Sequence, residues 1–541
     1  MAVLTIPRKV FEKDIGKVDD KMDHKIAMFG TPIDNYDDEN VNIEIFPNRP
    51  DLLSYQNFKY AIQCYFGKIK PINFKLKKSN YKIIVDKSVE KVRPYCMAAV
   101  IKNCKFDDER IKEIMNFQEK LHATTGRNRK KMAMGYYVLD KIKFPVKYTT
   151  DDPKKIIFAP LEMSQKMNAL QILSRHPTGR EYGNQLEGFD KFPVYYDSVG
   201  QVLSLPPIIN SDDLGRINND TKNILIECSG SDLNTLKKSI IIAVMDLLNA
   251  NPKAEAYSVD IEYSSKKESI SLDYEKINID VKNVNKLIGI NIKDSEIPKL
   301  LEKMGHKYKN KTVYYPAFRT DILHEVDIIE DIAIAYGYDK LVPQIPQIST
   351  IGEISKKEIV KKKISDILTN INLIETSSLH LTTKDAQIKA GLNKENFTEV
   401  ENSKTEFNIL RNDLSHYLLK ILSENLDVEY PQEIFEQGVV FDSNLKESEH
   451  LAIAITPNNF TRLKQVFEYL TRMLNLENKI SLKKADSNNY SIEGRIASIN
   501  LNDKEIGFIC EVHPQIIKNF KIKTPIALLE IDLNKLFNEF K

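Results

Sequence analysis

Tryptophan is absent from this chain of 541 residues, and cysteine is scarce. The five cysteines are scattered, with no CxxC pair and no histidine at zinc-ligand spacing. This pattern argues against a zinc site and predicts a reducing compartment. No window approaches 18 uncharged apolar residues, and residues 1–10 hold no apolar signal segment. We therefore expect a soluble cytoplasmic protein without a membrane-spanning segment.

Neither basic nor acidic residues are in clear excess. The 78 basic and 76 acidic residues leave a formal charge of +2, so any nucleic-acid surface must be local. No P-loop, GxGxxG or HExxH motif is present, which argues against the phosphate and metal sites that those motifs build. The length predicts three or four domains rather than one core.

The segment from Pro316 to Leu341 has the pattern of a buried helix. Asp321 stands near its start, where a short acceptor side chain can cap a helix. At about 100° per residue the apolar residues form one stripe, composed of Ile322, Val326, Ile329, Ala333 and Tyr336.

The same segment carries three more carboxylates, Asp327, Glu330 and Asp331, at spacings that bring helix side chains together. Like charges this close destabilise the helix unless a positive charge lies among them. Mg²⁺ takes oxygen ligands and keeps several waters, so one or two of these carboxylates would suffice to bind it. The alternative is a solvated acidic face balanced by nearby lysines.

Two further segments suggest local structure. FPNRPDLLS follows an expected strand at Val41 to Phe46, and Asp51 is placed to cap the next helix, which favours a structural strand–turn–helix corner. TTGRNRKK carries Arg127, Arg129, Lys130 and Lys131 around a glycine turn. Such a loop can bind RNA phosphates, although a run of this kind is more often a solvated surface.

Taken together, these segments resemble the phenylalanyl-tRNA synthetase beta subunit of the archaeal and eukaryotic type. The resemblance runs in family order through FPNRPDLLS, QEKLH with GRNRKK, LPPIIN, FRTDILHEVDIIEDIAIAYGYDKL, FEQGVVF and GFICEVHPQ. It implies a magnesium site, shared with the alpha subunit, at Asp321, Asp327, Glu330 and Asp331. Asp331 stands where the family often has Glu, so its side chain is one methylene shorter and less suited to direct ligation.

The resemblance also implies an editing domain, which hydrolyses tyrosine wrongly attached to the tRNA. Such a domain is needed because a hydrophobic pocket rejects an added hydroxyl only weakly. Ser204, Asn210 and Glu227 supply polar groups on expected strand ends and beside a Pro-Pro corner. Each could equally form an ordinary turn or strand-end hydrogen bond. His176, before Pro177, is a further candidate, although a lone histidine is usually structural.

The C-terminal part resembles the beta subunit's copy of the class II synthetase catalytic fold. Arg411 in LRND is similar to the arginine that binds the α-phosphate in active enzymes, but the Gly-rich segment ending in Arg that such enzymes carry is missing near the C-terminus. We therefore expect a non-catalytic interface domain, with ATP bound and aminoacylation performed on the alpha subunit.

The expected fold is a mixed α+β multidomain chain. It comprises an N-terminal module (1–85), an α/β editing-like domain (86–268), a small winged-helix-like domain with the magnesium site (269–346) and a class II synthetase-like antiparallel sheet domain without active-site motifs (347–541). The resemblance implies an α2β2 heterotetramer that uses ATP and Mg²⁺ to attach phenylalanine to tRNA(Phe). The alternatives are a non-catalytic RNA-binding or assembly protein that has lost editing, and a metal-dependent hydrolase built on the acidic helix.

Overall fold

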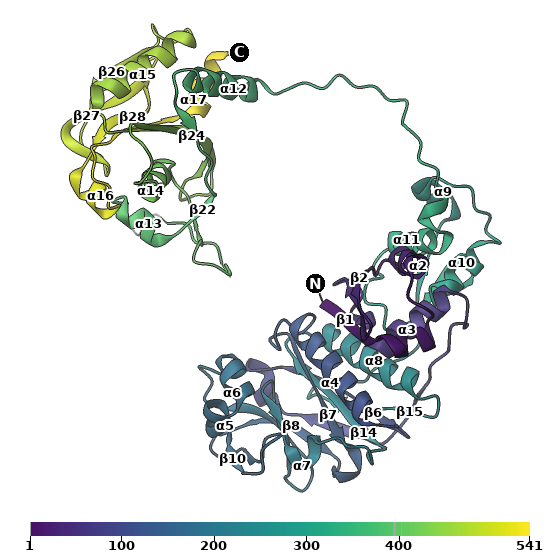
Figure 1. Cartoon of the computed structure of the whole chain (residues 1–541). Helices are drawn as coiled ribbons and strands as arrows, with labels where there is room; N and C mark the ends of the chain where they lie inside the picture. Colours follow the sequence, from purple (N-terminus) through teal and green to yellow (C-terminus); the bar gives the residue numbers. More distant parts are fainter. Residues whose placement is uncertain (1, 393–396, 402, 541) are drawn as a thin grey trace. The chain divides into compact units, whose positions relative to one another are not determined.

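The computed structural model describes residues 2–392, 397–401 and 403–540. The chain divides into two compact units, Met1–Gln344 and Ile345–Lys541, each of which is described by itself (Figure 1). Residues 341–355, which join the two units, contain no helix or strand. Several sheets with interleaved helices confirm the predicted mixed α+β class. Among the described residues, no helix has the length and apolar character to cross a membrane.

The first unit begins with a three-stranded antiparallel sheet in the order β1-β3-β2. Alternating burial along β3 directs Val41, Ile43 and Ile45 into the core. The elements are β1 (Ala2–Pro7), α1 (Arg8–Asp14), α2 (Asp20–Phe29), β2 (Ile33–Tyr36), β3 (Asn40–Ile45), η1 (Pro50–Leu53) and α3 (Tyr55–Tyr65). The prediction that Asp51 caps α3 is wrong: Ser54 accepts the capping hydrogen bond, because a 3-10 turn at Pro50–Leu53 intervenes.

A five-stranded sheet follows, in the order β4-β15-β6-β14-β7, and helix α8 packs on its central strands. Helix α4 packs beside β7, and α3 packs against α8 (Figure 1). The elements are β4 (Leu76–Lys77), β6 (Tyr95–Lys102), α4 (Asp108–Ala123), β7 (Met132–Val138), β14 (Ile224–Gly230), α8 (Leu233–Ala250) and β15 (Glu255–Ser258). As the capping rules predict, Asp107 caps α4.

A second, seven-stranded sheet has the order β13-β12-β11-β8-β5-β16-β17. Its strands are β5 (Lys82–Val85), β8 (Val146–Asp151), β11 (Phe192–Tyr196), β12 (Val202–Leu205), β13 (Ile209–Asn210), β16 (Asp260–Glu262) and β17 (Lys267–Glu268). Short elements surround one end: β9 (Ile157–Phe158), β10 (Met167–Asn168), α5 (Ala169–Arg175), α6 (Pro177–Tyr182) and α7 (Asp212–Gly215). Strands β4 and β5 lie before residue 86 yet join the two large sheets, so residues 76–85 pack with the part of the chain that follows them.

The rest of the first unit is a small α+β module with its own apolar cluster around Val284, Leu301 and Ile332. Its sheet has the order β18-β20-β19. The elements are β18 (Glu275–Asn278), α9 (Val281–Ile288), α10 (Ile297–Lys303), β19 (Lys307–Lys309), β20 (Thr312–Tyr315) and α11 (Glu325–Tyr336).

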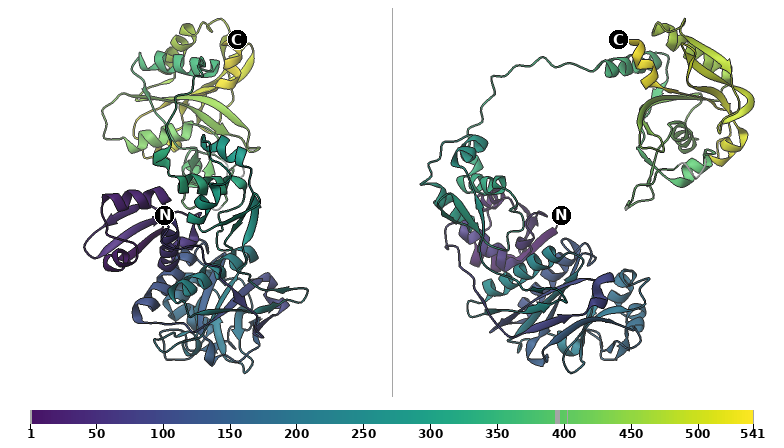
Figure 2. Two further views of the ribbon diagram at one scale, coloured as in Figure 1. Left: turned by 90° about the vertical axis from the view of Figure 1, so that its right-hand side faces the viewer. Right: turned by 180° about the vertical axis from the view of Figure 1, so that it is seen from behind.

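The second unit is built on a seven-stranded sheet in the order β21-β24-β25-β29-β28-β27-β26, antiparallel except for the β21–β24 pair. Helices α12, α15 and α17 cover one apolar face, and α13, α14 and α16 border the other (Figure 2). The strands are β21 (Ile374–Glu375), β24 (Gln432–Phe441), β25 (Glu447–Thr456), β26 (Ile480–Lys484), β27 (Ser491–Leu501), β28 (Lys504–Val512) and β29 (Ala527–Asp532). A short pair, β22 (Leu381–Thr382) with β23 (Ile409–Leu410), completes the strands of this unit. The helices are α12 (Lys356–Thr369), α13 (Lys384–Lys389), α14 (Ser415–Glu424), α15 (Phe460–Met473), α16 (Pro514–Asn519) and α17 (Leu533–Phe537).

Candidate functional site

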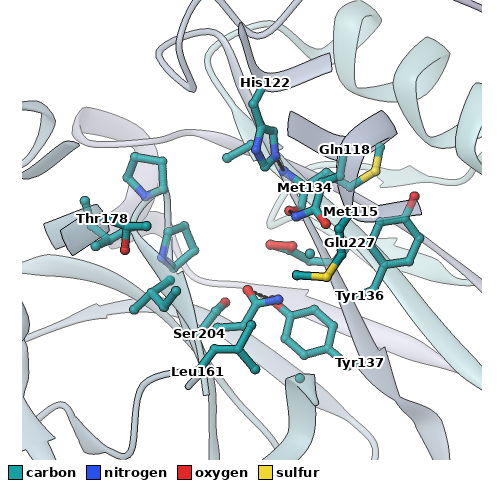
Figure 3. Close-up of a pocket in the computed structure, with 18 of the residues that line it drawn as sticks. Met115, Gln118, His122, Met134, Tyr136, Tyr137, Leu161, Thr178, Ser204 and Glu227 are labelled. Atoms are coloured by element: carbon teal, nitrogen blue, oxygen red, sulfur yellow. Dashed lines mark hydrogen bonds between the residues drawn. The ribbon is translucent and has the colours of Figure 1, made fainter. Parts of the chain in front are cut away.

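A cavity of about 400 Å³ lies in the first unit, where strands of the two large sheets approach each other. Its walls come from β7 and β14 on one side, from β12 and β13 on the other, and from α4 and the start of α6. Ser204, Asn210 and Glu227, the three editing candidates that the resemblance suggested, all line it. Figure 3 shows Glu227, Ser204 and Tyr137 around the open space.

Glu227 lies in the middle of β14, between Ala98 of β6 and Gly135 of β7, rather than at a strand end as the sequence suggested. Its side chain is only 3% exposed. Burial raises the pKa of the carboxyl from 4.5 to about 8, and the nearby Arg93 guanidinium only partly opposes this shift. The carboxyl is therefore mainly protonated at neutral pH, so it can donate a hydrogen bond as well as accept one.

Asn210 is fixed at the opposite wall. Its side-chain oxygen accepts a hydrogen bond of 3.1 Å from the Tyr137 hydroxyl. Because the oxygen is engaged, the amide nitrogen is the group that remains to donate to a ligand. Gly215 makes room here, since a Cβ at that position would lie 2.9 Å from the Asn210 Cβ.

Ser204 is buried on β12, and its hydroxyl has no hydrogen-bond partner within the described part of the chain. A buried hydroxyl without a partner costs roughly 1–3 kcal/mol, which a polar ligand could recover. Ser204 and Asn210 are directly paired across β12 and β13, so the two side chains lie on the same face. The cavity thus has polar groups on two walls and apolar residues between them.

His176 also lines the cavity, but both ring nitrogens have partners. Nδ1 accepts a hydrogen bond from the Thr178 backbone N–H as the N-cap of α6, and Nε2 lies 3.3 Å from the Leu161 carbonyl oxygen. A lone histidine is usually structural, and this one caps a helix.

Sequence reasoning missed three lining residues, Gln118, His122 and Tyr137. Gln118 donates to the Met134 carbonyl, and His122 Nε2 accepts from the Met134 N–H at 2.8 Å. Burial lowers the pKa of His122, which keeps the ring neutral in that role. The i, i+4 spacing on the expected helix could have placed Gln118 and His122 on one face. Nothing in the sequence indicated Tyr137.

The cationic loop before β7 supports the cavity through one buried arginine. Arg129 donates to the Ile208 carbonyl at 2.8 Å and to Glu119 at 2.9 Å, and it stacks over the Tyr182 ring at 4.3 Å. It therefore holds the wall that follows Pro206 and Pro207, and its guanidinium does not face solvent. Arg127 and Lys130 remain exposed, and Lys131 is half-exposed near Asp232.

The acidic helix contains a buried ion-pair network. Arg319 lies between Asp321 and Asp331, at 2.6 Å and 2.8 Å, and His306 lies 2.6 Å from Asp331. Although burial opposes it, the Arg319 charge holds the pKa of both aspartates below the usual range. The positive charge that the repelling carboxylates require is thus supplied by Arg319 of the same motif.

The other two carboxylates lie outside this network. The Asp327 carboxylate accepts hydrogen bonds from the backbone N–H groups of Leu323 and His324, both at 2.7 Å, and so closes the start of α11. Glu330 is exposed, and desolvation together with Asp331 and Asp327 raises its pKa. In the described part of the chain no three His, Cys, Asp or Glu side chains are arranged to hold a metal. Glu330 is the exposed member of the four predicted ligands, whereas one Asp327 oxygen is bonded to two backbone N–H groups.

Two details of the predicted helix are wrong. His324 caps α11, and Asp321 pairs with Arg319 instead, because the helix begins only at Glu325. Val326, placed in the apolar stripe, is 45% exposed. The buried face is formed by Ile328, Ile329, Ile332, Ala333 and Ala335.

The FPNRPDLLS corner belongs to the same electrostatic region. Arg49 binds Asp51 through two hydrogen bonds, just as Arg319 binds Asp321. The Arg49 charge contributes to the lowered pKa of Asp321, after the larger effect of Arg319. Two Arg-x-Asp pairs therefore lie close together. These contacts support the interpretation of the FPNRPDLLS segment as a structural corner.

Arg411 in the second unit is buried and is bonded through Nε and Nη1. Its guanidinium donates to Glu436 at 2.7 Å, to Ser378 Oγ at 2.8 Å and to the Val439 carbonyl at 2.7 Å. Both Arg411 and Glu436 are 2% exposed. Two of its three guanidinium nitrogens, Nε and Nη1, are thereby bonded within the second unit.

Matches to two family models define the class: a chain assembled from tRNA synthetase modules. Residues 277–338 match the family described as "tRNA synthetase B5 domain", and residues 341–533 match "Phenylalanyl tRNA synthetase beta chain CLM domain". The chain is 34% identical to the phenylalanine–tRNA ligase beta subunit of Archaeoglobus fulgidus, over 99% of both chains. It is 33% identical to that of Pyrococcus horikoshii, over 91% of this chain and 90% of the other.

The chain belongs to the phenylalanine–tRNA ligase beta subunit family. Among solved structures, an N-terminal fragment of the Pyrococcus horikoshii phenylalanyl-tRNA synthetase beta subunit matches with a TM-score of 0.58 and 30% identity. The match covers 62% of this chain and 99% of the fragment. A beta subunit of an aminoacyl-tRNA ligase implies an alpha subunit and tRNA as partners.

Proposed function

We propose that this chain forms an α2β2 phenylalanine–tRNA ligase in the cytoplasm, where it supports ATP-dependent attachment of phenylalanine to tRNA(Phe). The alpha subunit binds ATP and performs the aminoacylation. The buried Arg411–Glu436 pair supports this division, because the arginine that would contact the α-phosphate is ion-paired with Glu436 inside the sheet domain. The chain itself contributes tRNA contacts and structural support.

The first unit is proposed to hydrolyse tyrosine from mischarged tRNA. The observation that carries this proposal is the meeting of Ser204, Asn210 and Glu227 in one cavity. A cavity of about 400 Å³ accommodates an aromatic side chain. A phenol entering it would supply the hydrogen-bond partner that the buried polar groups need, whereas phenylalanine would leave them unpaired.

The reaction is hydrolysis of the ester between the amino acid and the tRNA ribose. Water attacks the ester carbonyl carbon, the bond to the ribose oxygen breaks, and a proton passes to that oxygen, which releases tyrosine and tRNA. The protonated Glu227 carboxyl and the Asn210 amide bind the phenol hydroxyl, and Ser204 orients the ligand or the water. These groups act by positioning, and the step needs no metal.

The test is Tyr-tRNA hydrolysis by the assembled enzyme carrying Glu227→Ala or Asn210→Ala. Both rates should fall at least tenfold, while phenylalanine charging stays unchanged. Ser239→Ala is the matched control, because it removes another buried, unpaired hydroxyl from the same unit but outside the cavity. Equal hydrolysis by wild type and both variants would favour the alternative of an RNA-binding or assembly subunit without editing.

A magnesium site on the acidic helix is part of the proposal. Glu330 and Asp327 would hold the ion through oxygen and water contacts, and Asp321 and Asp331 would act through Arg319. Bound Mg²⁺ would supply positive charge next to the repelling carboxylates. If this is right, Glu330→Gln should raise the Mg²⁺ concentration needed for half-maximal charging, and an unchanged value would exclude Glu330 as a ligand.

A further inference from the structure

The segment that joins the two units has a three-residue repeat. From Val342 the sequence reads VPQ-IPQ-IST-IGE-I. The first column is aliphatic throughout, the second holds only Pro, Ser and Gly, and the third is polar. The aliphatic column is composed of Val342, Ile345, Ile348, Ile351 and Ile354. We call residues 342–354 the strap.

A period of three fits neither an α-helix nor a strand, and a 3-10 helix of this length would be uncommon. A helix repeats every 3.6 residues, and a strand alternates every two. Polyproline II has three residues per turn, so it places every third side chain on one face. Pro343 and Pro346 favour that conformation and oppose the helix. In polyproline II geometry the strap would present one apolar line about 37 Å long.

The apolar line is exposed within the described residues. Val342, Ile345, Ile348, Ile351 and Ile354 are 72–96% exposed, whereas the aliphatic residues of the preceding and following helices are largely buried. The five side chains offer roughly 300–600 Å² of apolar surface. This is less than the about 800 Å² per partner of a standard interface, so the strap would extend an interface rather than form one alone.

Charge identifies the kind of partner. No charged residue occurs from Val342 to Gly352, in a chain where 28% of residues are charged. An uncharged aliphatic line offers nothing to RNA phosphates or lipid headgroups, which are bound by cations. It suits an apolar groove on a protein, as in the recognition of other polyproline II segments.

We propose that the strap docks along an apolar groove of the alpha subunit. This rests on the proposed assembly of the two chains, because family membership makes the alpha subunit the protein partner that this chain must have. A strap at the junction of the units would lengthen the lifetime of the complex without taking part in any chemistry.

The experiment compares two triple variants in complex with the alpha subunit of the same organism. Ile345→Ser/Ile348→Ser/Ile351→Ser removes the aliphatic column. Gln344→Ser/Gln347→Ser/Thr350→Ser changes the polar column equally and serves as the matched control. Exchange with labelled alpha subunit should be at least tenfold faster for the first variant and within twofold of wild type for the control. Amide hydrogen exchange over 341–355 should slow when the alpha subunit binds wild type.

Each contrary result is distinct. If the aliphatic variant exchanges its alpha subunit at the wild-type rate, the docking of the strap is overturned and the proposed function stands. Failure of the wild-type chain to bind the alpha subunit overturns both. Slow amide exchange already in the lone chain would mean that the strap is seated on its own chain. Self-association of the lone chain that the aliphatic variant abolishes would mean that a second copy is the partner. Either result overturns the proposal.

Discussion

Glu227 combines a proposed role in binding with a cost in folding stability. Its pKa rises from 4.5 to about 8 on folding, so the folded state resists ionisation that the unfolded chain permits. The fold therefore loses stability as pH rises from about 4.5 to about 8, because the unfolded chain releases the proton first. Below 4.5 both states keep the proton, and this contribution vanishes.

Glu227→Gln should stabilise the protein against unfolding. The amide cannot ionise, so its advantage in unfolding free energy over wild type should grow from pH 5 to pH 9, by up to about 4 kcal/mol. Chemical denaturation at the two pH values measures this difference. A gain that is independent of pH would show that Glu227 does not titrate in this range. A loss of stability at both values would mean that it is a structural hydrogen-bonding residue.

Arg319 shows what can and cannot be read at the level of single residues. The sequence indicated that the carboxylates around Asp331 need a positive partner, and the family pattern suggested a metal. The structure supplies the guanidinium of Arg319, two residues before Asp321, together with His306 from the turn after α10. Spacing along a helix shows which like charges approach each other, but the counter-charge came from loops whose course no periodicity predicts.

At the scale of elements, the cavity depends on the contact between β13 and α7. Gly215→Ala would bring a Cβ to 2.9 Å from the Asn210 Cβ, so one of the two elements must shift by a few tenths of an ångström. Because a small misplacement weakens catalysis strongly, Tyr-tRNA hydrolysis should fall by about 3–10-fold. Phenylalanine charging should not change, since the proposed charging site lies on another chain.

Gly183→Ala is the control for that prediction. A Cβ at Gly183 would meet only Leu173 side-chain atoms, at 3.5 Å or more, which is an ordinary contact. It should leave hydrolysis within twofold of wild type. If the two variants behave alike, the close fit at Asn210 has no bearing on the reaction.

Elements with strong local signals were predicted well, and their assembly was not. The sequence predicted a strand at Val41 to Phe46, and β3 occupies Asn40–Ile45. The start of α11 was predicted too early, because Asp321 has the chemistry of a cap but is engaged by Arg319. The family resemblance selected Ser204, Asn210 and Glu227. Their meeting depends on two sheets whose strands come from distant parts of the chain, which local sequence does not encode.

For the whole molecule, the sequence indicated a change near residue 346, and the two units divide at Gln344 and Ile345. Within the first unit, one apolar core contains residues from Leu4 to Ala335. A boundary at residue 85 cuts between β5 and β6, and β5 pairs with β8 and β16 in the seven-stranded sheet. The place of β5 is decided by the strand order of the sheet, and composition along the chain carries no signal for that order. The four domain ranges remain predictions.

Charging of tRNA should require both chains, and Arg411 tests where the reaction takes place. Arg411→Met should leave the rate per assembled complex and the KM for ATP within twofold of wild type, because the guanidinium is bound to Glu436. The same change leaves a buried carboxylate without its counter-charge, so the second unit should lose about 3–5 kcal/mol of stability. Adding Glu436→Gln removes that charge and should restore part of the loss. A raised KM for ATP in the stable double variant, or charging by this chain alone, would instead place nucleotide chemistry on the second unit.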